Sequence, residues 1–366
     1  MGNSTSASTS NPKVALVVGK GVIGRSLVEY LDGQPEWSKV IIVARSDPDF
    51  ETRASTIKVD LLDIKDTDAK LGGGAIADVT HVFFCGLAPG GTDDVKTNVA
   101  LLKNIVDAVD KHAPKLERVL LNEGLKYYGV HLGKFKTPAK EDDPRPAQHH
   151  FYHTQEDYMK ARAEPRPWEW VAIRPDVVCG YATGQMNLVI CIAVYCAIMK
   201  ELGEPITFPG KAGSFDKLAQ VCYAPHLARA CEWAATADGA ANEAFNVVNG
   251  DFFRWDHVWP QFADYFGVAF KGVKTVDLVE TMKDKGPVWD RIVAKYDLKP
   301  TKLEDLCNWG FANWCWGNEF DIMADTTKIR QAGFHETVDS ELMFKRMFDD
   351  FKTMRIIPEY ESAKAA

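Results

Sequence analysis

The sequence predicts an α/β protein with a doubly wound parallel sheet and a smaller, mostly helical lobe towards the C-terminus. Short apolar runs alternate with amphipathic segments over the first half of the chain, a pattern typical of buried parallel strands joined by helices. A glycine-rich turn follows the first apolar run, and the alternation loosens after about residue 180. The length of 366 residues allows one large domain with an appended lobe, or two domains.

Each apolar run is short and bounded by polar residues, glycine or proline, as expected for strands. The runs expected as strands are 13–18, 40–44, 55–60, 81–85, 118–121, 168–173 and 244–248, the last one returning to the sheet. Helices are expected where apolar residues recur every three or four positions. These segments are 22–31, 92–112, 186–202, 225–235 and 251–266.

The turn Gly19-x-Gly21-x-x-Gly24 lies directly after the first expected strand and opens the first expected helix. Gly19 permits the tight turn, Gly21 lets the backbone approach a pyrophosphate, and Gly24 allows close packing of helix on strand. Val22 and Ile23 then belong to the helix N-terminus that favours the anionic phosphates. This context predicts a Rossmann-type dinucleotide site, the alternative being a Rossmann-like fold that binds no nucleotide.

The tip of the second expected strand selects the cofactor. It carries Arg45 and Ser46 in place of the acid that NAD enzymes use for the ribose hydroxyls, which favours NADP(H) and its 2′-phosphate. Arg45 could instead be a solvated strand-end charge, and Asp47 and Asp49 lie close by. The third expected strand ends at Asp60, which we expect, with the adjacent Leu61, beside the adenine.

The domain boundaries follow from these patterns. We expect residues 12–180 to form the NADP-binding Rossmann domain, completed by about 215–250 and 322–350. Residues 181–214 and 251–321 are expected to form the substrate lobe.

The N-terminal segment 1–11 is rich in Ser and Thr, so we expect a disordered tail. It also matches the minimal myristoylation pattern, Gly2 with a hydroxyl at Ser6, and whether Gly2 is modified is left open.

Composition narrows the partners. The net charge of −8 argues against nucleic acid as the main partner, because phosphate neutralisation needs a basic face. The sequence contains no run of about 18 uncharged apolar residues, so no membrane span is expected. The eight cysteines form no Cys-x-x-Cys pair, which favours reduced thiols in a cytoplasmic protein. The nine histidines show no metal-ligand spacing, so no metal site is expected.

Two segments in the middle of the chain carry the reactive residues. They read Lys-Tyr-Tyr-Gly-Val at 126–130 and Phe-Tyr-His-x-x-Glu-Asp at 151–157. Both resemble the progesterone 5β-reductase/iridoid synthase-like (PRISE) family of atypical extended short-chain dehydrogenases/reductases, and the resemblance extends over nearly all of residues 13–358, closest to its fungal branch. It implies that Tyr152 and Lys126 are the catalytic residues and also contact the cofactor.

The resemblance implies NADPH-dependent reduction of an activated double bond, as in the 1,4-reduction of an enone in secondary metabolism. Tyr152 would donate a hydrogen bond to the developing enolate, and Lys126 would lower the tyrosine pKa and orient the nicotinamide ribose. The same pair would serve C=O or C=N reduction. A non-redox isomerase or cyclase, or an NADP-sensing protein, is the alternative from a different class.

Two residues depart from the family pattern beside this pair. Glu123 stands where a small hydroxyl residue is usual, and His153 replaces a second tyrosine. Glu123 is interpreted as an acid or base with a raised pKa, or as a salt-bridge partner that points away. Both residues are predicted to contact the substrate.

The substrate wall is expected after the sixth strand and in the aromatic segment near residue 310. The predicted contacts are Val178, Tyr181, Met186, Asn187 and Trp316. Their apolar character implies a hydrophobic small molecule. The alternative is that the aromatic residues form only the core of the lobe. The sequence does not identify the substrate and leaves a homodimer open.

Overall fold

A computed structural model describes residues 12–182 and 186–360, so the expected tail, with Gly2, lies outside the described part. The strands of the central sheet are β1 (Lys13–Val18), β2 (Trp37–Ala44), β3 (Ser55–Lys58), β4 (His81–Phe84), β5 (Arg118–Asn122), β6 (Glu169–Pro175) and β11 (Glu243–Val247). All are parallel, in the order β11-β6-β5-β4-β1-β2-β3. The predicted fold class is confirmed.

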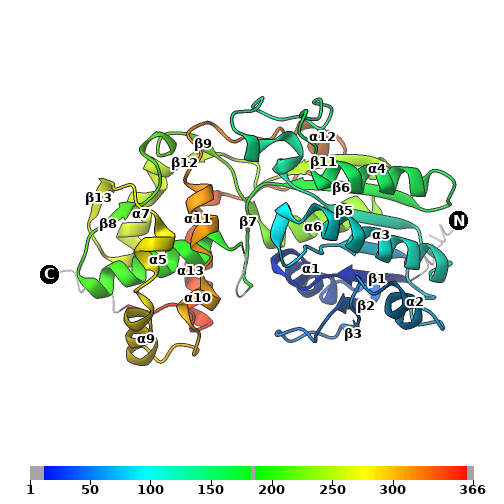
Figure 1. The fold of residues 1–366 in the computed structure, drawn as a ribbon, viewed down its shortest axis with the longest axis horizontal. Helices are drawn as coiled ribbons and strands as arrows, with labels where there is room; N and C mark the ends of the chain where they lie inside the picture. Colours follow the sequence, from blue (N-terminus) through cyan, green and yellow to red (C-terminus); the bar gives the residue numbers. More distant parts are fainter. Residues whose placement is uncertain (1–11, 183–185, 361–366) are drawn as a thin grey trace, which may run out of the picture.

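Helices cover both faces of this sheet (Figure 1). They are α1 (Val22–Asp32), α2 (Ile64–Leu71), α3 (Val95–His112), α4 (Phe151–Ala163) and α6 (Ala224–Thr236). Alternate residues of β1 show why: Ala15 and Val17 pack with α1 and α6, whereas Leu16 and Val18 pack with α3 and α4. Side chains of a strand point alternately to opposite faces, so both faces of the sheet are apolar and both need cover.

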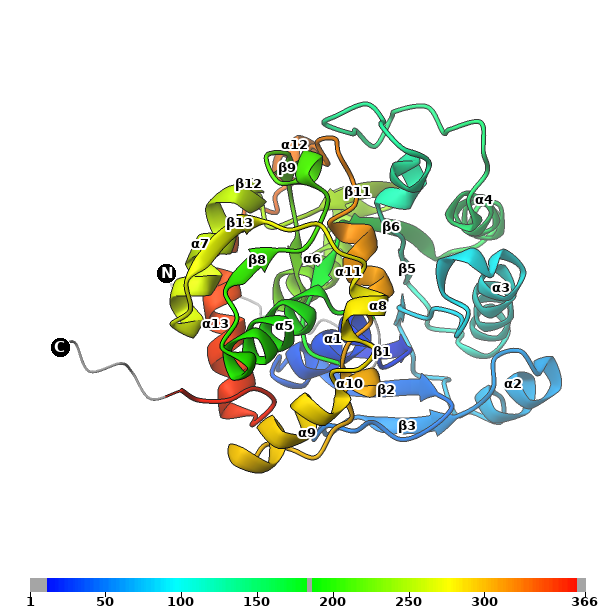
Figure 2. The same cartoon turned by 60° about the vertical axis from the view of Figure 1, so that its left-hand side comes forward.

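The lobe lies beside the sheet, at the left of Figure 1 and towards the viewer in Figure 2. Its helices are α5 (Leu188–Leu202), α7 (Trp255–Phe266), α8 (Leu278–Met282), α9 (Gly286–Lys295), α10 (Leu303–Leu306), α11 (Trp309–Cys315) and α13 (Ser340–Thr353). It also contains the strand pair β8 (Ile206–Phe208) and β13 (Phe270–Val273). The core of the lobe includes the fully buried Trp259, Trp289 and Trp316.

The remaining elements are short. They are β7 (Val178–Cys179), paired with β10 (Cys222–Tyr223); β9 (Leu218–Ala219), paired with β12 (Phe253–Arg254); α12 (Thr327–Gln331); and the 3-10 helices η1 (Gly91–Asp93), η2 (Leu125–Tyr128), η3 (Val130–Leu132), η4 (Ala212–Ser214) and η5 (Asp238–Ala240).

Three details differ from the sequence prediction. The expected helix 92–112 is divided into η1 and α3, because the Asp94 side chain accepts a hydrogen bond from the Thr97 amide and caps α3. The expected helix at 251 begins only at Trp255, after β12. The segment 322–350 was expected to complete the Rossmann domain; Ile329 and Phe334 do pack in the core beside the sheet, but Phe344 and Phe348 of α13 pack in the lobe core.

Candidate active site

The glycine turn has the geometry that a dinucleotide requires. Gly19 has a φ of +96°, a conformation that favours glycine. A Cβ on Gly24 would lie 2.1 Å from the carbonyl oxygen of Gly19, whereas one on Gly21 would meet nothing within 4 Å. Gly21 precedes α1, and no side chain caps the first amides of that helix. Val22 and Ile23 therefore begin a helix whose free N–H groups suit a pyrophosphate.

Positive side chains gather at the tip of β2. Arg45 and Ser46 are exposed directly after the strand. The Asp47 carboxylate pairs with Lys58 Nζ at 2.6 Å, and the Asp47 carbonyl oxygen accepts a hydrogen bond from Lys20 Nζ. Asp47 is thus neutralised by a lysine, which removes one source of repulsion for a 2′-phosphate near Arg45.

The residues beyond β3 are fixed by local hydrogen bonds. Asp60 is exposed, and its Oδ1 accepts from the Leu62 amide at 3.0 Å. Leu61 is buried, and its carbonyl oxygen accepts from the Asn104 side chain at 2.6 Å. Both residues lie just past the carboxyl end of β3, beside β2 in the sheet.

Tyr152 and Lys126 lie at the carboxyl edge of the sheet. Tyr152 belongs to the first turn of α4, and a Cβ on Gly124 would lie 3.5 Å from its hydroxyl oxygen. Lys126 lies in η2, donates to the Thr92 hydroxyl and has Asp93 Oδ1 at 4.0 Å. Within residues 12–182 and 186–360 no hydrogen bond joins Lys126 to Tyr152.

Burial controls the protonation of this pair. It raises the pKa of the Tyr152 phenol, and the nearby Glu123 carboxylate raises it further. Burial also lowers the pKa of Lys126, against the attraction of Asp93. A phenol with a raised pKa keeps its proton at neutral pH, so Tyr152 can act as a hydrogen-bond donor.

A buried ion-pair network lies beside Tyr152. The guanidinium of Arg174, at the end of β6, is 2.8 Å from Glu123 Oε2 and 2.6 Å from Glu156 Oε2. It also donates to the Tyr128 hydroxyl at 3.0 Å and stacks on the Tyr127 ring, 3.4 Å from its centroid. All three charged side chains are at most 2% exposed.

The two carboxyl groups of this network differ in their supply of positive charge. Burial acts to raise the pKa of Glu156, but Arg174 and Lys160 hold it below its ordinary value. Burial raises the pKa of Glu123 to about 8, because Arg174 is its one close cation. The second oxygen of Glu123, Oε1, is buried without a hydrogen-bond partner in the described chain. Glu123 therefore holds its proton to a higher pH than an ordinary carboxyl group does.

Three predicted substrate residues are used internally, and the structure argues against a substrate contact for each. His153 is fully buried: its Nδ1 accepts from the His150 amide at 3.1 Å, and its Nε2 bonds the Tyr127 carbonyl oxygen at 2.8 Å. Asn187 is buried and caps α5 by accepting from the Ile190 amide. Trp316 is fully buried in the lobe core, as the alternative interpretation of the aromatic residues held. Sequence patterns alone do not reveal such burial.

Two of the other predicted wall residues, Val178 and Tyr181, lie beside α1. Tyr181 stacks on Arg25 of α1, with the guanidinium 4.8 Å from the ring centroid. Val178 is partly buried and packs in the core beneath α1, whereas Met186 is 36% exposed.

A narrow cavity of 30 Å³ adjoins the Tyr152–Lys126 region. Its apolar wall includes Val177, Leu188, Trp255, Trp314 and Phe320. The Trp314 ring centroid is 5.7 Å from Lys126 Nζ, which links the cavity to the lysine.

The cavity wall also carries Asp176, which the sequence analysis missed. Its position three residues after the expected strand 168–173, and directly after β6, was the signal that could have identified it.

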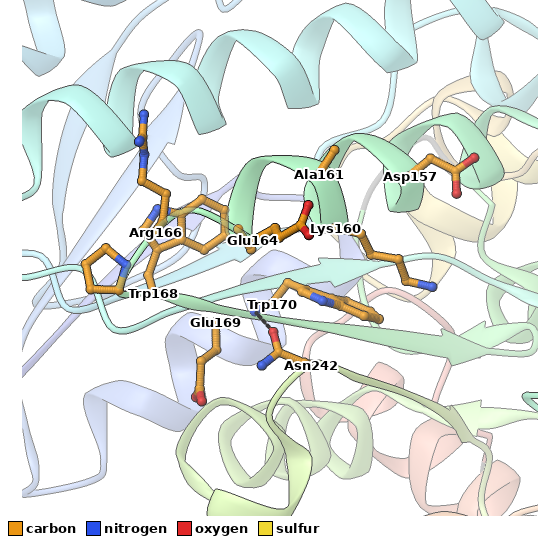
Figure 3. A pocket seen from close by; sticks show the side chains of 11 residues that line it. Asp157, Lys160, Ala161, Glu164, Arg166, Trp168, Glu169, Trp170 and Asn242 are labelled. Atoms are coloured by element: carbon orange, nitrogen blue, oxygen red, sulfur yellow. Dashed lines mark hydrogen bonds between the residues drawn. The ribbon is translucent and has the colours of Figure 1, made fainter.

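A wider pocket than this cavity lies elsewhere. It has a volume of 700 Å³ and is lined by the second half of α4, the start of β6 and Asn242 (Figure 3). Lys160, Glu164 and Trp170 form part of its wall. Because it borders the amino end of β6, it is at the opposite edge of the sheet from Tyr152.

The described residues offer neither a membrane span nor a metal site. No helix there is long and apolar enough to cross a membrane, and no group of three or more His, Cys, Asp or Glu side chains could hold a metal ion.

The chain is similar to known proteins over nearly its whole length. The chain is 36% identical to the (S)-8-oxocitronellyl enol synthase ISY1 of Nepeta racemosa, covering 94% of this chain and 93% of the relative. It is 32% identical to the short chain dehydrogenase gsfE of Penicillium aethiopicum, over 95% of this chain and 100% of the relative. The fold is similar to that of the UDP-glucose 4-epimerase of Thermus thermophilus, with a TM-score of 0.62, 16% identity and coverage of 93% and 99%.

The sequence model of the PRISE-like Rossmann-fold domain matches residues 57–358. That match spans most of the chain and includes both reactive segments. The protein therefore belongs to the PRISE-like family, on the fold of the extended short-chain dehydrogenases/reductases.

Proposed function

We propose that this protein is an NADPH-dependent reductase that adds hydride to an activated C=C bond of a hydrophobic small molecule, as in the 1,4-reduction of an enone. One observation supports this function above all. The proton-bearing hydroxyl of Tyr152 lies beside Gly124, at the sheet edge that also carries the glycine turn and Lys126.

The residues explain how such a reaction would be assisted. NADPH, when bound, supplies the hydride. Hydride arriving at the β-carbon of an enone moves negative charge onto the carbonyl oxygen, and Tyr152 donates a hydrogen bond to that oxygen. Because burial raises the pKa of Tyr152, its proton stays available at neutral pH. The positive charge of Lys126 stabilises the same region of developing charge.

The names of the relatives fit this chemistry. Several are enol synthases, and one is a short chain dehydrogenase. An enol is the immediate product when hydride and then a proton are added to a conjugated carbonyl compound. The choice of NADPH is supported by exposed Arg45 and by Lys20 and Lys58, which both contact Asp47 at the tip of β2. A cytoplasmic location is supported by the eight free cysteines.

The test is turnover of NADPH with small enones such as 2-cyclohexen-1-one. Tyr152→Phe should remove most of the turnover while NADPH binding is retained, because the ring stays and only the donor is lost. Tyr158→Phe is the matched control, since Tyr158 lies on the same helix but bonds Asp107 on α3. Unchanged turnover in Tyr152→Phe would contradict the assignment.

A non-redox isomerase or cyclase is a second candidate, favoured by one specific observation. Glu123 carries a pKa raised to about 8 and an unpartnered oxygen close to Tyr152, which suits proton transfer. Mass spectrometry of the product separates the two functions. Reduction adds two hydrogens, whereas isomerisation or cyclisation leaves the mass unchanged.

A further inference from the structure

Asp176 puts a carboxyl group into the cavity wall beside the proposed reacting pair, where its polar neighbours are Ser214, Lys217, Gln220 and Asn318. It directly follows Pro175, the last residue of β6. A Cβ on Gly124 would lie 3.4 Å from the Pro175 carbonyl oxygen and 3.5 Å from the Tyr152 hydroxyl oxygen. The backbone of Asp176 therefore begins directly after the Pro175 carbonyl group, which lies next to Gly124 just as the Tyr152 hydroxyl does.

This carboxyl group has no cationic partner among the described residues. Lys217 lines the same cavity, but its Nζ pairs with Asp216 at 2.8 Å. The thiols nearby, Cys179 and Cys315, have pKa values raised by burial and stay neutral. Burial raises the pKa of Asp176 to about 7, opposed by the backbone N–H of Val177. Without a counter-charge this acid keeps its proton up to about neutral pH, and a bound cation would favour its ionised form.

The aromatic part of the wall suits a cation. Trp255, Trp314 and Phe320 line the cavity together with Asp176. The faces of aromatic rings attract ammonium groups, most strongly where water is excluded. The ammonium group of Lys126 lies 5.7 Å from the centroid of the Trp314 ring, within the range of a cation–π contact.

The size of the cavity defines what enters it. Its volume of 30 Å³ exceeds the roughly 10–15 Å³ that a cavity needs to hold one water molecule. A primary or methylated ammonium group is of this order, whereas a whole terpenoid or alkaloid skeleton is not. The cavity is thus a subsite for one small polar group, while the remainder of the substrate lies outside it, towards Tyr152.

We propose that this cavity binds a protonated nitrogen of the substrate, ion-paired to Asp176 and flanked by the rings of Trp255 and Trp314. The substrate class is therefore a hydrophobic amine that carries the reducible double bond. This inference rests on the proposed function for the identity of the substrate, but the cation subsite exists independently of the reaction.

The experiment compares two probes of similar size, benzylammonium and the uncharged benzyl alcohol. Their binding to the full-length protein with NADP⁺ is measured by ligand-observed NMR titration. The wild type should bind benzylammonium at least about tenfold more tightly than benzyl alcohol, because only the cation can pair with Asp176. Asp176→Asn should bind both probes equally.

The control is Asp290→Asn, which makes the same charge change at an exposed position of α9 in the same lobe and should keep the preference. If Asp176→Asn does not fold, Trp314→Leu replaces it and should reduce the preference severalfold. The inference would be overturned if the wild type showed no preference for benzylammonium over benzyl alcohol, or if a cavity variant kept that preference.

NADPH oxidation with 2-cyclohexen-1-one, measured on the same samples, separates this inference from the proposed function. Reduction without a cation preference would overturn the subsite alone. A cation preference without reduction would overturn the reaction alone.

Discussion

Replacing Glu123 by glutamine should change how the stability of this protein depends on pH. The pKa of Glu123 in the folded protein is raised to about 8, from an ordinary value of 4.5. In this interval the unfolded chain has lost the proton that the folded protein keeps. The free energy of unfolding of the wild type therefore falls as pH rises from about 4.5 to about 8.

The magnitude follows from the same numbers. Each pH unit between the two pKa values lowers the free energy of unfolding by about 1.4 kcal/mol. Between pH 5.5 and 8.5 the loss due to Glu123 is therefore on the order of 3 kcal/mol. A glutamine amide has no titrating proton to lose, and its oxygen could still accept from Arg174, so Glu123→Gln should escape this loss.

Urea unfolding at both pH values would measure this loss as the difference in the free energy of unfolding between the variant and the wild type. From pH 5.5 to 8.5, the free energy of unfolding of the variant should rise relative to that of the wild type by roughly 3 kcal/mol. Other groups that titrate in this range, such as Asp176, are present in both proteins and cancel. Glu164→Gln, at an exposed position outside the network, should show no such movement. A constant difference for Glu123→Gln would show that Arg174 keeps Glu123 ionised, and would refute the reasoning.

Three further predictions concern single residues. Gly24→Ala should abolish cofactor binding and lower the melting temperature, since the new Cβ would lie 2.1 Å from the Gly19 carbonyl oxygen; calorimetric titration with NADP⁺ and thermal melting check this. Arg45→Ala should weaken NADP⁺ binding by about tenfold to a hundredfold and leave NAD⁺ nearly unchanged, and equal losses for both would show that Arg45 does not contact the 2′-phosphate. His153→Ala should lower the free energy of unfolding by about 1–3 kcal/mol, because the buried Tyr127 carbonyl loses its partner; an unchanged urea midpoint would contradict this.

The sheet could be predicted from the sequence because its signals are local. Runs such as 13–18 are apolar at nearly every position, and a glycine turn directly after a strand specifies the first crossover. The role of α13 could not be predicted in this way. Its buried face, with Phe344 and Phe348, is visible as a pattern, but a pattern does not say whether that face meets the sheet or the lobe.

For the candidate site, too, only the residues in short local motifs could be predicted. Gly19, Gly24, Lys126 and Tyr152 belong to short motifs, so their neighbourhood in the sequence indicates their chemistry. The network around Arg174 joins residues 51 and 18 positions away, and no local pattern encodes such pairs.

Burial was equally invisible in the sequence. His153 and Trp316 have side chains suited to a pocket, yet backbone hydrogen bonds and core packing occupy them. Asp176 looks like an ordinary loop residue until the lobe covers it.

The most direct test of the central claim is transfer of deuterium from NADPH labelled at nicotinamide C4, with 2-cyclohexen-1-one as the acceptor. A sample labelled on each face is used in turn, and the product is analysed by NMR and mass spectrometry. The predicted result for the wild type is cyclohexanone that carries one deuterium at C3 with one of the two samples. With Tyr152→Phe in place of the wild type, no such deuterated cyclohexanone is expected. Deuterium at the carbinol carbon would show direct carbonyl reduction instead. A converted acceptor that carries no deuterium with either sample would contradict the assignment of the protein as a reductase.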